Sequence, residues 1–395
     1  MSGLQDAVIV EALRTPVGRR RGRLAGWHPV DLAAEVVRAV VERSGIDPAS
    51  IDDVIVGCVD QVGEQAVNVA RSIALAAGLP ETVPATTVDR QCGSSQQAAH
   101  FAAQGVMAGA YDIAIAAGVE SMTRVPMFAN APDRSEVYGP RFRARYGLAD
   151  DAFIEQGLSG EIVAERWGVT RAEMDRFAAA SHRRALRATE EGRFAGEIVP
   201  IAVTDAEGGE GVMDRDEGIR PGTTEEALAG LAPVFREDGL LTAGNSSQIS
   251  DGAAALLIMS ADRARDLGLR PRARFHAFAL AGVDPVEMLS APMPATRAVL
   301  RRAGLSLADI DLYEVNEAFA SVPLAWLADL AGEGADPERL NVNGGAIALG
   351  HPLGATGARL MTSLVAEMER SGARYGLQAM CEGGGMANAT ILERC

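Results

Sequence analysis

The chain has 395 residues, of which 48% are hydrophobic and 23% are charged, and its formal net charge at pH 7 is −16. This length allows two or three domains with large cores. The sequence contains no run of about 18 uninterrupted apolar residues, so it predicts no membrane span. We expect no nucleic-acid partner, because neutralising phosphates requires a basic surface.

The four cysteines are Cys58, Cys92, Cys381 and Cys395, and no two of them have CxxC spacing. They are too few for a disulfide scaffold. The first residues, 1–13, are acidic in places and β-like, which is not typical of a signal peptide. We therefore expect a cytoplasmic protein, in which an unpaired cysteine is either an inert core residue or a reactive thiol.

The first part of the chain predicts alternating helices and strands. A helix with apolar residues at helical spacing ends at Gly45, and a short linker and the apolar strand 54–56 follow. A helix rich in small residues begins just after Cys92 and leads to another apolar strand, 113–116. Near-continuously apolar strands between helices predict an α/β fold with a mostly parallel sheet covered on both faces.

Cys92 lies in the sequence DRQCGSS, residues 89–95, directly before the alanine-rich helix. At a helix N-terminus the positive end of the helix dipole lowers the pKa of a thiol and favours the thiolate. Gly93 allows a substrate to approach the backbone closely. A buried structural cysteine is the alternative, but the polar neighbours on both sides favour a nucleophile.

Residues 122–249 lie between two similar parts of the chain, one around residues 38–52 and the other around residues 297–311, and belong to neither of them. They contain a turn-rich stretch at 130–133 and one long amphipathic helical region, about 159–191. Long insertions of this kind are usually functional. We expect an inserted loop domain over the site. The remaining residues then form an N-terminal half (1–121 and 250–273) and a C-terminal half (274–395).

The second half repeats the first. Residues 297–311, RAVLRRAGLSLADID, match residues 38–52, RAVVERSGIDPASID, at a constant offset of 259 positions. The copy again predicts a helix that ends at a glycine, followed by the strand 312–315 and later the strand 377–380. The same offset relates Cys92 to His351. If the two copies pack with pseudo-two-fold symmetry, the helix N-termini that carry these residues meet at one cleft.

Three residues of the second half lie where predicted elements begin or end. Asn316 follows the strand 312–315, and capping of the next helix is its alternative role. His351 lies at a tight backbone corner in NGGAIALGHPLGATG, residues 343–357. Cys381 stands before three glycines, which predicts either a site residue on an exposed hairpin or a plain structural turn. No Cys/His cluster indicates a metal, and no GxGxxG or GKS/T pattern indicates a nucleotide site.

Four motifs together resemble the thiolase superfamily: the Cys92 segment, NEAF at 316–319, GHP at 350–352, and Cys381 before its glycines. The resemblance covers essentially the whole chain and includes RTP at 14–16 and TAGNSSQISDGA at 242–253. It implies the thiolase fold, an α/β arrangement of two pseudo-symmetric βαβαβαββ halves in five layers, α/β/α/β/α, with an inserted loop domain.

The resemblance also implies an enzyme, an acyltransferase that uses coenzyme A. Such an enzyme cleaves 3-oxoacyl-CoA to acetyl-CoA and a shortened acyl-CoA, reversibly, by a ping-pong mechanism through an acyl-Cys92 intermediate. Coenzyme A and acyl-CoA are then substrates, and no permanently bound cofactor is expected. The family is usually dimeric or a dimer of dimers, so we expect a homodimer or homotetramer.

The resemblance assigns a role to each motif residue. Cys92 is acylated after His351 accepts its proton, and Cys381 acts as acid and base at the acetyl α-carbon. Asn316, through a held water, and His351 stabilise the enolate oxygen. The backbone N–H groups of Cys92 and Gly383 bind the thioester oxyanion. The positions implied to contact substrate or coenzyme A are Ser247, Arg220 and Phe319.

Two departures from the family pattern concern the site. The family commonly has Cys-x-Gly-Gly-Gly-x-Gly, whereas here Ala387 replaces the last glycine and Glu382 adds a charge. The short-chain biosynthetic subgroup often has His-Met-Gly where this chain has residues 155–157, EQG. This change favours degradation of longer or bulkier acyl chains, and residues 246–251 also resemble actinobacterial enzymes that act on steroid side chains.

Three alternatives remain open at this stage. An acetoacetyl-CoA thiolase that runs the Claisen condensation uses the same residues. Decarboxylating and other ketoacyl synthases share the fold and a nucleophilic cysteine, but their partners are typically His/His or His/Asn, so Cys381 argues against them. A non-catalytic thiolase-like protein that binds lipid or coenzyme A is disfavoured by the complete set of Cys92, His351, Cys381 and Asn316.

Overall fold

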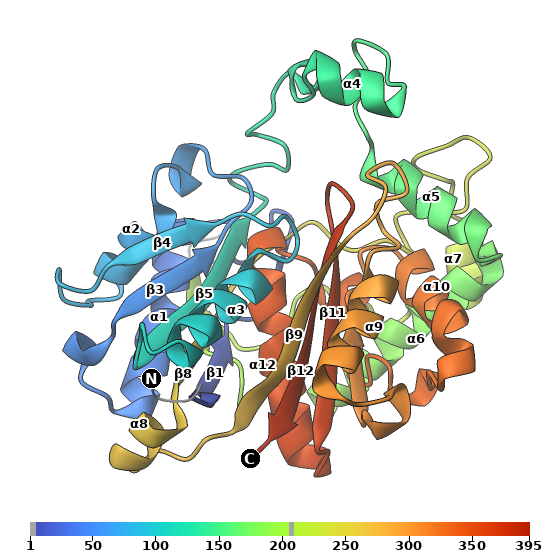
Figure 1. Cartoon of the computed structure of the whole chain (residues 1–395). Helices are drawn as coiled ribbons and strands as arrows, with labels where there is room; N and C mark the ends of the chain where they lie inside the picture. Colours follow the sequence, from blue (N-terminus) through green and yellow to red (C-terminus); the bar gives the residue numbers. More distant parts are fainter. Residues whose placement is uncertain (1–4, 205–208) are drawn as a thin grey trace.

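Two runs of strands with the same order form the main sheet of the computed structural model, which describes residues 5–204 and 209–395 (Figure 1). In order of adjacency, the first run is β1 (Ala7–Arg14), β8 (Ser250–Ser260), β5 (Ile113–Ser121), β3 (Asp53–Gly57) and β4 (Ala85–Val88). The second run is β9 (Ala273–Gly282), β12 (Met386–Arg394), β11 (Tyr375–Glu382) and β10 (Leu312–Val315). In the place that corresponds to β4, beside β10, the second run has an isolated β-bridge between Tyr313 and Leu340. The predicted duplication is therefore confirmed.

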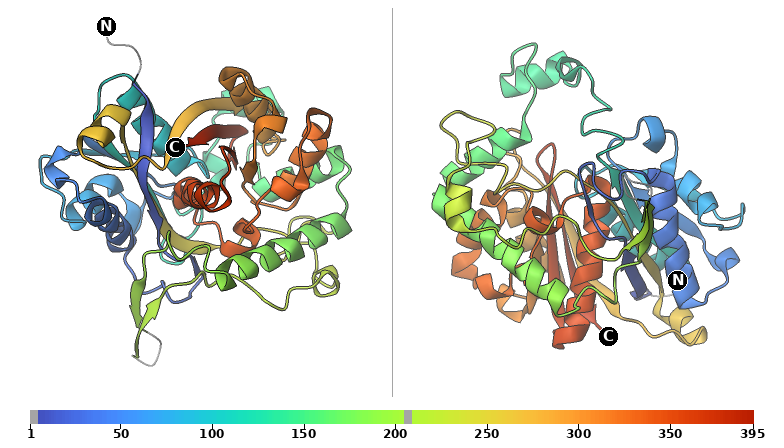
Figure 2. Two further views of the ribbon diagram at one scale, coloured as in Figure 1. Left: turned by 90° about the horizontal axis from the view of Figure 1, so that it is seen from below. Right: turned by 180° about the vertical axis from the view of Figure 1, so that it is seen from behind.

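Helices cover both outer faces of the two runs and fill the space between them (Figures 1 and 2). The helices α1 (Pro29–Ser44) and α2 (Val69–Ala76) pack on the first run, and α9 (Pro292–Ala303) and α10 (Ser321–Leu330) pack on the second. Between the runs lie α3 (Ser94–Met107) and α12 (Thr356–Ser371). The expected five-layered α/β/α/β/α arrangement is confirmed, and α1 and α9 end at the left-handed residues Gly45 and Gly304 as predicted.

The prediction of a mostly parallel sheet was wrong. Among the named strands of the main sheet, β3 with β4, β3 with β5, and β10 with β11 pair in parallel, whereas the other strand pairs are antiparallel. In each half the last strand, β8 or β12, returns antiparallel beside β5 or β11. The apolar composition of these strands reports burial on both faces, which helices on both sides produce whatever the strand direction.

The central helices α3 and α12 meet through backbone atoms at their N-terminal ends. A Cβ atom on Gly357 would lie 2.3 Å from the backbone N of Gln96, and one on Gly118 would lie 2.3 Å from the carbonyl O of Gly354. Only glycine permits such an approach. The segments that carry the candidate cysteine and histidine are thus brought together from opposite halves, in agreement with the pseudo-symmetry argument.

The insertion between β5 and β8 crosses the top and one side of the molecule (Figures 1 and 2). The amphipathic helical region predicted at about 159–191 is helical, but it is divided into two helices, α5 (Gln156–Arg166) and α6 (Arg171–Glu190). Gly168 adopts a left-handed φ of 65°, and a capping box of Thr170 and Glu173 starts the second helix. The other elements of the insertion are α4 (Pro140–Tyr146), β6 (Ile201–Thr204), β7 (Glu210–Met213) and α7 (Glu225–Ala229).

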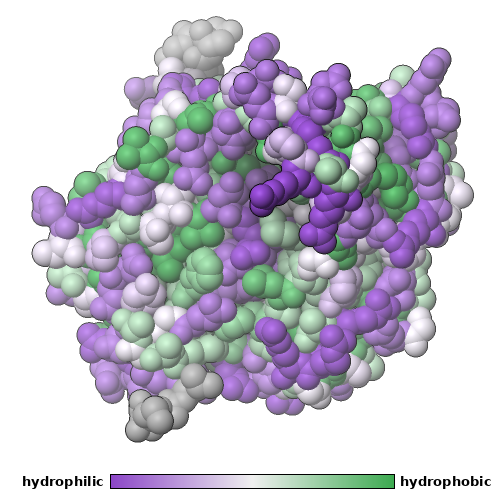
Figure 3. Space-filling model, turned by 45° about the horizontal axis from the view of Figure 1, so that its top comes forward, coloured by the Kyte–Doolittle hydropathy of each residue, from purple (hydrophilic) through white to green (hydrophobic). Residues whose placement is uncertain are grey.

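The remaining strand and α-helices of the described part of the chain are short: β2 (Gly18–Arg19), α8 (Ala261–Asp266) and α11 (Ala346–Leu349). Seven 3-10 helices of three residues each lie in its connecting segments. The extended stretch predicted at the N-terminus contains β1, and its residues 1–4 lie outside the described ones. No helix within residues 5–204 or 209–395 is long and apolar enough to cross a membrane. On the face seen in Figure 3, hydrophilic side chains predominate and hydrophobic ones gather in small patches, in keeping with the strongly acidic composition.

Candidate active site

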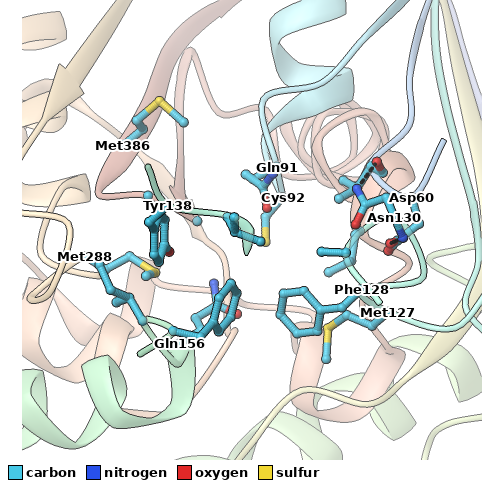
Figure 4. Close-up of a pocket in the computed structure, with 18 residues that line it drawn as sticks. Asp60, Gln91, Cys92, Met127, Phe128, Asn130, Tyr138, Gln156, Met288 and Met386 are labelled. Carbon is cyan, nitrogen blue, oxygen red and sulfur yellow. Dashed lines mark hydrogen bonds between the residues drawn. The ribbon is translucent and has the colours of Figure 1, made fainter. Parts of the chain in front are cut away.

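Cys92 lies in the turn between β4 and α3, and its sulfur points into a cavity of about 480 Å³ (Figure 4). The turn is tight: Gln91 has a left-handed φ of 49°, and Ser94 Oγ donates a hydrogen bond of 2.6 Å to the Gln91 carbonyl. The side chain of Cys92 is buried, with 4% of the residue exposed. The turn therefore holds the thiol at the floor of the cavity.

The electrostatic environment of Cys92 differs from the prediction. Burial, which is the largest influence, and the nearby Glu382 raise the pKa of its thiol to about 12, although a hydrogen bond with the Gln156 side chain acts in the opposite direction. We predicted a lowered pKa from the helix N-terminus, and that prediction was wrong because removing the thiolate from water outweighs the helix dipole. The resting residue is a thiol and requires a base to become a nucleophile.

His351 is buried between α11 and α12, and its hydrogen bonds define its tautomer. Thr356 Oγ1 donates its one hydroxyl proton to the carbonyl of Pro352 at 2.8 Å. The same oxygen lies 2.7 Å from His351 Nδ1, and it can only accept a hydrogen bond there. Nδ1 therefore carries the proton, and Nε2 presents a lone pair. Burial lowers the pKa of His351 to about 3, and Arg359 acts in the same direction. The imidazole is neutral at pH 7.

Asn316 follows β10 and faces the free nitrogen of His351, with 3.5 Å between Asn316 Nδ2 and His351 Nε2. The alternative role as a helix cap is wrong, since the N-cap of α10 is Ala320. The other amide atom, Asn316 Oδ1, is buried without a hydrogen-bond partner in the described part of the chain. It is thus available to accept a hydrogen bond from a water or ligand.

Cys381 lies near the end of β11 and is fully buried, so its placement on an exposed hairpin was wrong. The hairpin turn itself consists of the following glycines, and Gly384 and Gly385 adopt left-handed φ values of 80° and 79°. Burial raises the pKa of Cys381 well above its usual value, and the electrostatic effect of Cys92 raises it further. The two thiols therefore influence one another electrostatically. Gly383, at the start of the turn, lines the same cavity as Cys92.

Of the three residues implied to contact substrate or coenzyme A, Ser247 and Phe319 lie near the segment of His351, and Arg220 lies near His182. Ser247 N donates to the carbonyl next to Phe319, that of Ala318, at 2.9 Å, and the following residue, Gln248, accepts a hydrogen bond from His351 N. Ser247 is half-buried and Phe319 is buried, whereas Arg220 is exposed and its backbone N donates to His182. None of these three is among the residues that line the cavity at Cys92.

Most of the cavity wall comes from residues that we did not predict. Phe128 and Met127 lie on one side of the Cys92 sulfur, and Tyr138 and Met288 lie on the other, with Gln156 between them (Figure 4). Only Gln156 had a signal in the sequence, because it lies in the segment that replaces the family's His-Met-Gly. The others come from loops whose course no local pattern predicts.

Within residues 5–204 and 209–395, no group of three or more His, Cys, Asp and Glu side chains could hold a metal ion. The four cysteines, all of them in the described part of the chain, are free.

The duplicated fold carries the Cys92 thiol on a cavity, a second buried thiol at Cys381, and a neutral His351 imidazole beside Asn316. His351, Cys381 and Asn316 are not among the residues that line the cavity at Cys92. The family model "Thiolase, N-terminal domain" matches residues 7–262, and "Thiolase, C-terminal domain" matches residues 269–394. The chain belongs to the thiolase family and is an acyltransferase.

Individual relatives agree with this membership. The chain is 50% identical to a steroid 3-ketoacyl-CoA thiolase of Mycobacterium tuberculosis, with 99% of this chain and 95% of that protein covered. It is 46% identical to a 3-ketoacyl-CoA thiolase of Bacillus subtilis, covering 99% and 100% of the two chains. The crystal structure of a Bacillus anthracis acetyl-CoA acetyltransferase superposes with a TM-score of 0.90 at 40% identity and covers both chains completely.

Proposed function

We propose that this thiolase is degradative and cleaves 3-oxoacyl-CoA with coenzyme A to acetyl-CoA and a shortened acyl-CoA. The observation that carries the proposal is the cavity of about 480 Å³ that opens on the Cys92 thiol. Its wall is mainly apolar and includes Phe128, Tyr138, Phe153 and Met288. A space of this size and character suits an acyl chain far larger than an acetyl group.

In the proposed first step, Cys92 attacks the 3-oxo carbonyl and its proton passes to His351 Nε2. The carbon–carbon bond then breaks, which leaves the acyl group on Cys92 and acetyl-CoA as its enolate, and Cys381 protonates the α-carbon of this enolate. The backbone N–H groups of Cys92 and Gly383 stabilise the first oxyanion, and each such donor contributes about 3 kcal/mol. Asn316, through a water, and His351 stabilise the enolate oxygen.

In the second step, the thiol of coenzyme A gives its proton to the Cys381 thiolate and attacks the acyl-Cys92 thioester. The shortened acyl-CoA leaves, and His351 returns the proton to the Cys92 sulfur. Both thiols and the neutral imidazole are thereby restored. The raised pKa values of the two cysteines and the lowered pKa of His351 support such a resting state. Ser247, Arg220 and Phe319 are the residues proposed to contact coenzyme A or the substrate.

The substrate proposal is tested by steady-state thiolysis of acetoacetyl-CoA, a long-chain 3-oxoacyl-CoA and a 3-oxoacyl-CoA with a steroid ring system. Each buried methylene contributes about 0.8 kcal/mol, so we expect kcat/KM to be at least about tenfold higher for the two large substrates. A preference for acetoacetyl-CoA would contradict the proposal and identify an acetoacetyl-CoA thiolase. Acyl-CoA binding without turnover of any substrate would identify a non-catalytic protein.

The hydrogen bond between Thr356 and His351 leads to a further prediction about the rate of thiolysis. In a Thr356→Val variant the Nδ1–H of the buried imidazole loses its acceptor, which costs about 1–3 kcal/mol. We expect kcat for thiolysis to fall about tenfold or more, because the alternative tautomer places the proton on Nε2. Thr356→Ser retains the hydroxyl and should restore most of the rate. Equal losses in the two variants would show that packing of the methyl group, not the tautomer, is what matters.

Three coarser properties are proposed together. The N-terminal half comprises 1–121 and 250–273, the loop domain 122–249, and the C-terminal half 274–395; the end of β5 at Ser121 and the start of β8 at Ser250 support these limits. The free cysteines suit the reducing cytoplasm. We also propose a homodimer or homotetramer, on the basis of family resemblance.

A further inference from the structure

Glu317 is a buried carboxyl group that the proposed mechanism does not use. It follows Asn316 directly after β10, and its exposed fraction is 1%. Three donors surround its oxygens: Oε2 accepts from Ser181 Oγ at 2.7 Å and from the backbone N of Ile347 at 3.1 Å, and Oε1 accepts from Asn341 Nδ2 at 3.0 Å. Buried polar groups are normally hydrogen-bonded. The partners of Glu317 are notable because they come from three separate segments of the chain.

The carboxyl group of Glu317 is packed against the segment that leads to His351. A Cβ atom on Gly345, the N-cap of α11, would lie 2.3 Å from Glu317 Cδ, so only glycine fits there while the carboxyl stays in place. Gly345 N also donates to Ser181 Oγ at 3.0 Å. The short helix α11 is capped by Gly350, the residue before His351. Glu317 and Ser181 therefore fix the start of the helix that leads to the imidazole.

Asn341 connects the same carboxyl group to β10. Its Nδ2 donates to the carbonyl of Val315 at 2.9 Å as well as to Glu317, and its Oδ1 accepts from Val315 N at 2.9 Å. Val315 is the last residue of β10 and precedes Asn316. The residues on both sides of Asn316 are therefore held in one hydrogen-bonded cluster.

The side chain of Asn316 has few contacts of its own. In the described part of the chain its Oδ1 has no partner, and the hydrogen-bonding contact of its Nδ2 is the long one of 3.5 Å to His351 Nε2. His351 is held independently, because its backbone N donates to Ser250 Oγ at 3.2 Å and its ring contacts Thr356. The direction of the Asn316 amide therefore depends on how the backbone around it is fixed.

We propose that Glu317 is a positioning residue: its carboxyl group fixes the backbone that carries Asn316 against the helix that leads to His351, so that the amide and the imidazole face one enolate oxygen. This inference rests on the proposed function, in which Asn316, through a water, and His351 stabilise that oxygen. A misplacement of about 1 Å at a reacting group can cost about 10²-fold in rate. Since Ser181 lies on α6, the insertion contributes to this positioning as well as to the cavity wall.

The test is Glu317→Gln in the full-length protein. An amide has one acceptor oxygen, and its NH₂ group meets a donor whichever way it is turned, so at least one of the three hydrogen bonds is lost. We expect kcat for thiolysis and the exchange of acetyl-CoA α-hydrogens with solvent deuterium to fall about 10- to 100-fold, with KM little changed. Acylation of Cys92 by acetyl-CoA, followed by intact-protein mass spectrometry, should keep its rate, because that step does not use Asn316 in the proposed mechanism.

Asp311→Asn is the matched control at the other end of β10. The carboxyl group of Asp311 accepts from Arg374 N at 2.7 Å and from Tyr375 N at 2.9 Å, so it also ties a second segment to this strand. The substitution makes the same chemical change far from Asn316 along β10. We expect it to leave kcat, hydrogen exchange and acylation unchanged.

Unchanged hydrogen exchange in folded Glu317→Gln would overturn the proposal, as would an equal fall in exchange and acylation or an equal loss in Asp311→Asn. Thermal unfolding checks the fold. If Glu317→Gln does not fold, Ser181→Ala is measured instead, because it removes only the hydroxyl shared by Glu317 and Gly345; exchange should fall by a smaller factor while acylation persists, and unchanged exchange would again overturn the proposal. Absence of both acylation and exchange in the unaltered protein would refute the proposed function itself, so the two failures are distinguishable.

Discussion

Replacing Cys92 by serine should lower kcat/KM for thiolysis by at least about 10³-fold, the scale expected for loss of a covalent nucleophile. The buried site already holds the thiol in its protonated form, with a pKa of about 12. A serine hydroxyl is a much weaker acid than a thiol, so the neutral His351 imidazole is too weak a base to activate it. Serine is nearly isosteric with cysteine, so substrate binding and thermal unfolding should change little.

The measurement combines steady-state thiolysis with intact-protein mass spectrometry after mixing with acetyl-CoA. The unaltered protein should gain one acyl group per chain, and the Cys92→Ser variant should gain none. Cys395→Ser is the control, because Cys395 is exposed at the end of the chain and should be silent. An acyl group that still appears in Cys92→Ser, on another residue, would show that the nucleophile has been misassigned.

Replacing Cys381 by alanine should separate the two halves of the reaction. In the proposed mechanism, acylation by acetyl-CoA depends on Cys92 and His351 and not on Cys381, so it should persist. Cleavage and condensation both require a proton to move to or from the α-carbon, and loss of a positioned acid or base typically costs about 10²–10⁴-fold. We therefore expect the mass of the acyl-enzyme to appear while thiolysis falls by this factor.

The Cys381→Ala experiment has a second readout in isotope exchange. The unaltered protein should exchange the α-hydrogens of acetyl-CoA with deuterium from the solvent, because in the proposed mechanism Cys381 removes and returns these protons, and the variant should not. Full thiolysis activity in Cys381→Ala would exclude the acid and base role. Loss of acylation together with cleavage would show that the two sulfurs act as one unit.

The repeated segments predicted much of the fold. The offset between the copies of the sequence anticipated two runs of strands, the glycines that end α1 and α9, and the meeting of α3 with α12. The direction of the strands could not be predicted from the sequence, because a strand buried on both faces is apolar whichever way it runs. The reduction of one strand to a bridge at Leu340 was also not accessible, because the surrounding residues do not repeat the first half.

The candidate site was less completely predictable. Motifs singled out Cys92, His351, Cys381 and Asn316, and the fold gathers their segments at the junction of the two halves. The acidity of Cys92 was predicted with the wrong sign, since a local pattern reveals the helix dipole but not the burial that outweighs it. Tyr138 and Met288 come from distant loops, and their approach to the sulfur depends on tertiary packing alone.

The contact between α3 and α12 has a consequence for how the enzyme adapts to different substrates. The backbone of Gly357 in α12 touches that of Gln96 in α3, and Gly118 of β5 touches the carbonyl of Gly354 just before α12, so no side chain separates the nucleophile segment from the histidine segment at these points. A displacement of one half is transmitted directly to the other, so the reacting groups form an unyielding inner wall. Tolerance for acyl groups of different shapes must therefore reside in the opposite wall, where aromatic and methionine side chains from the insertion face the sulfur.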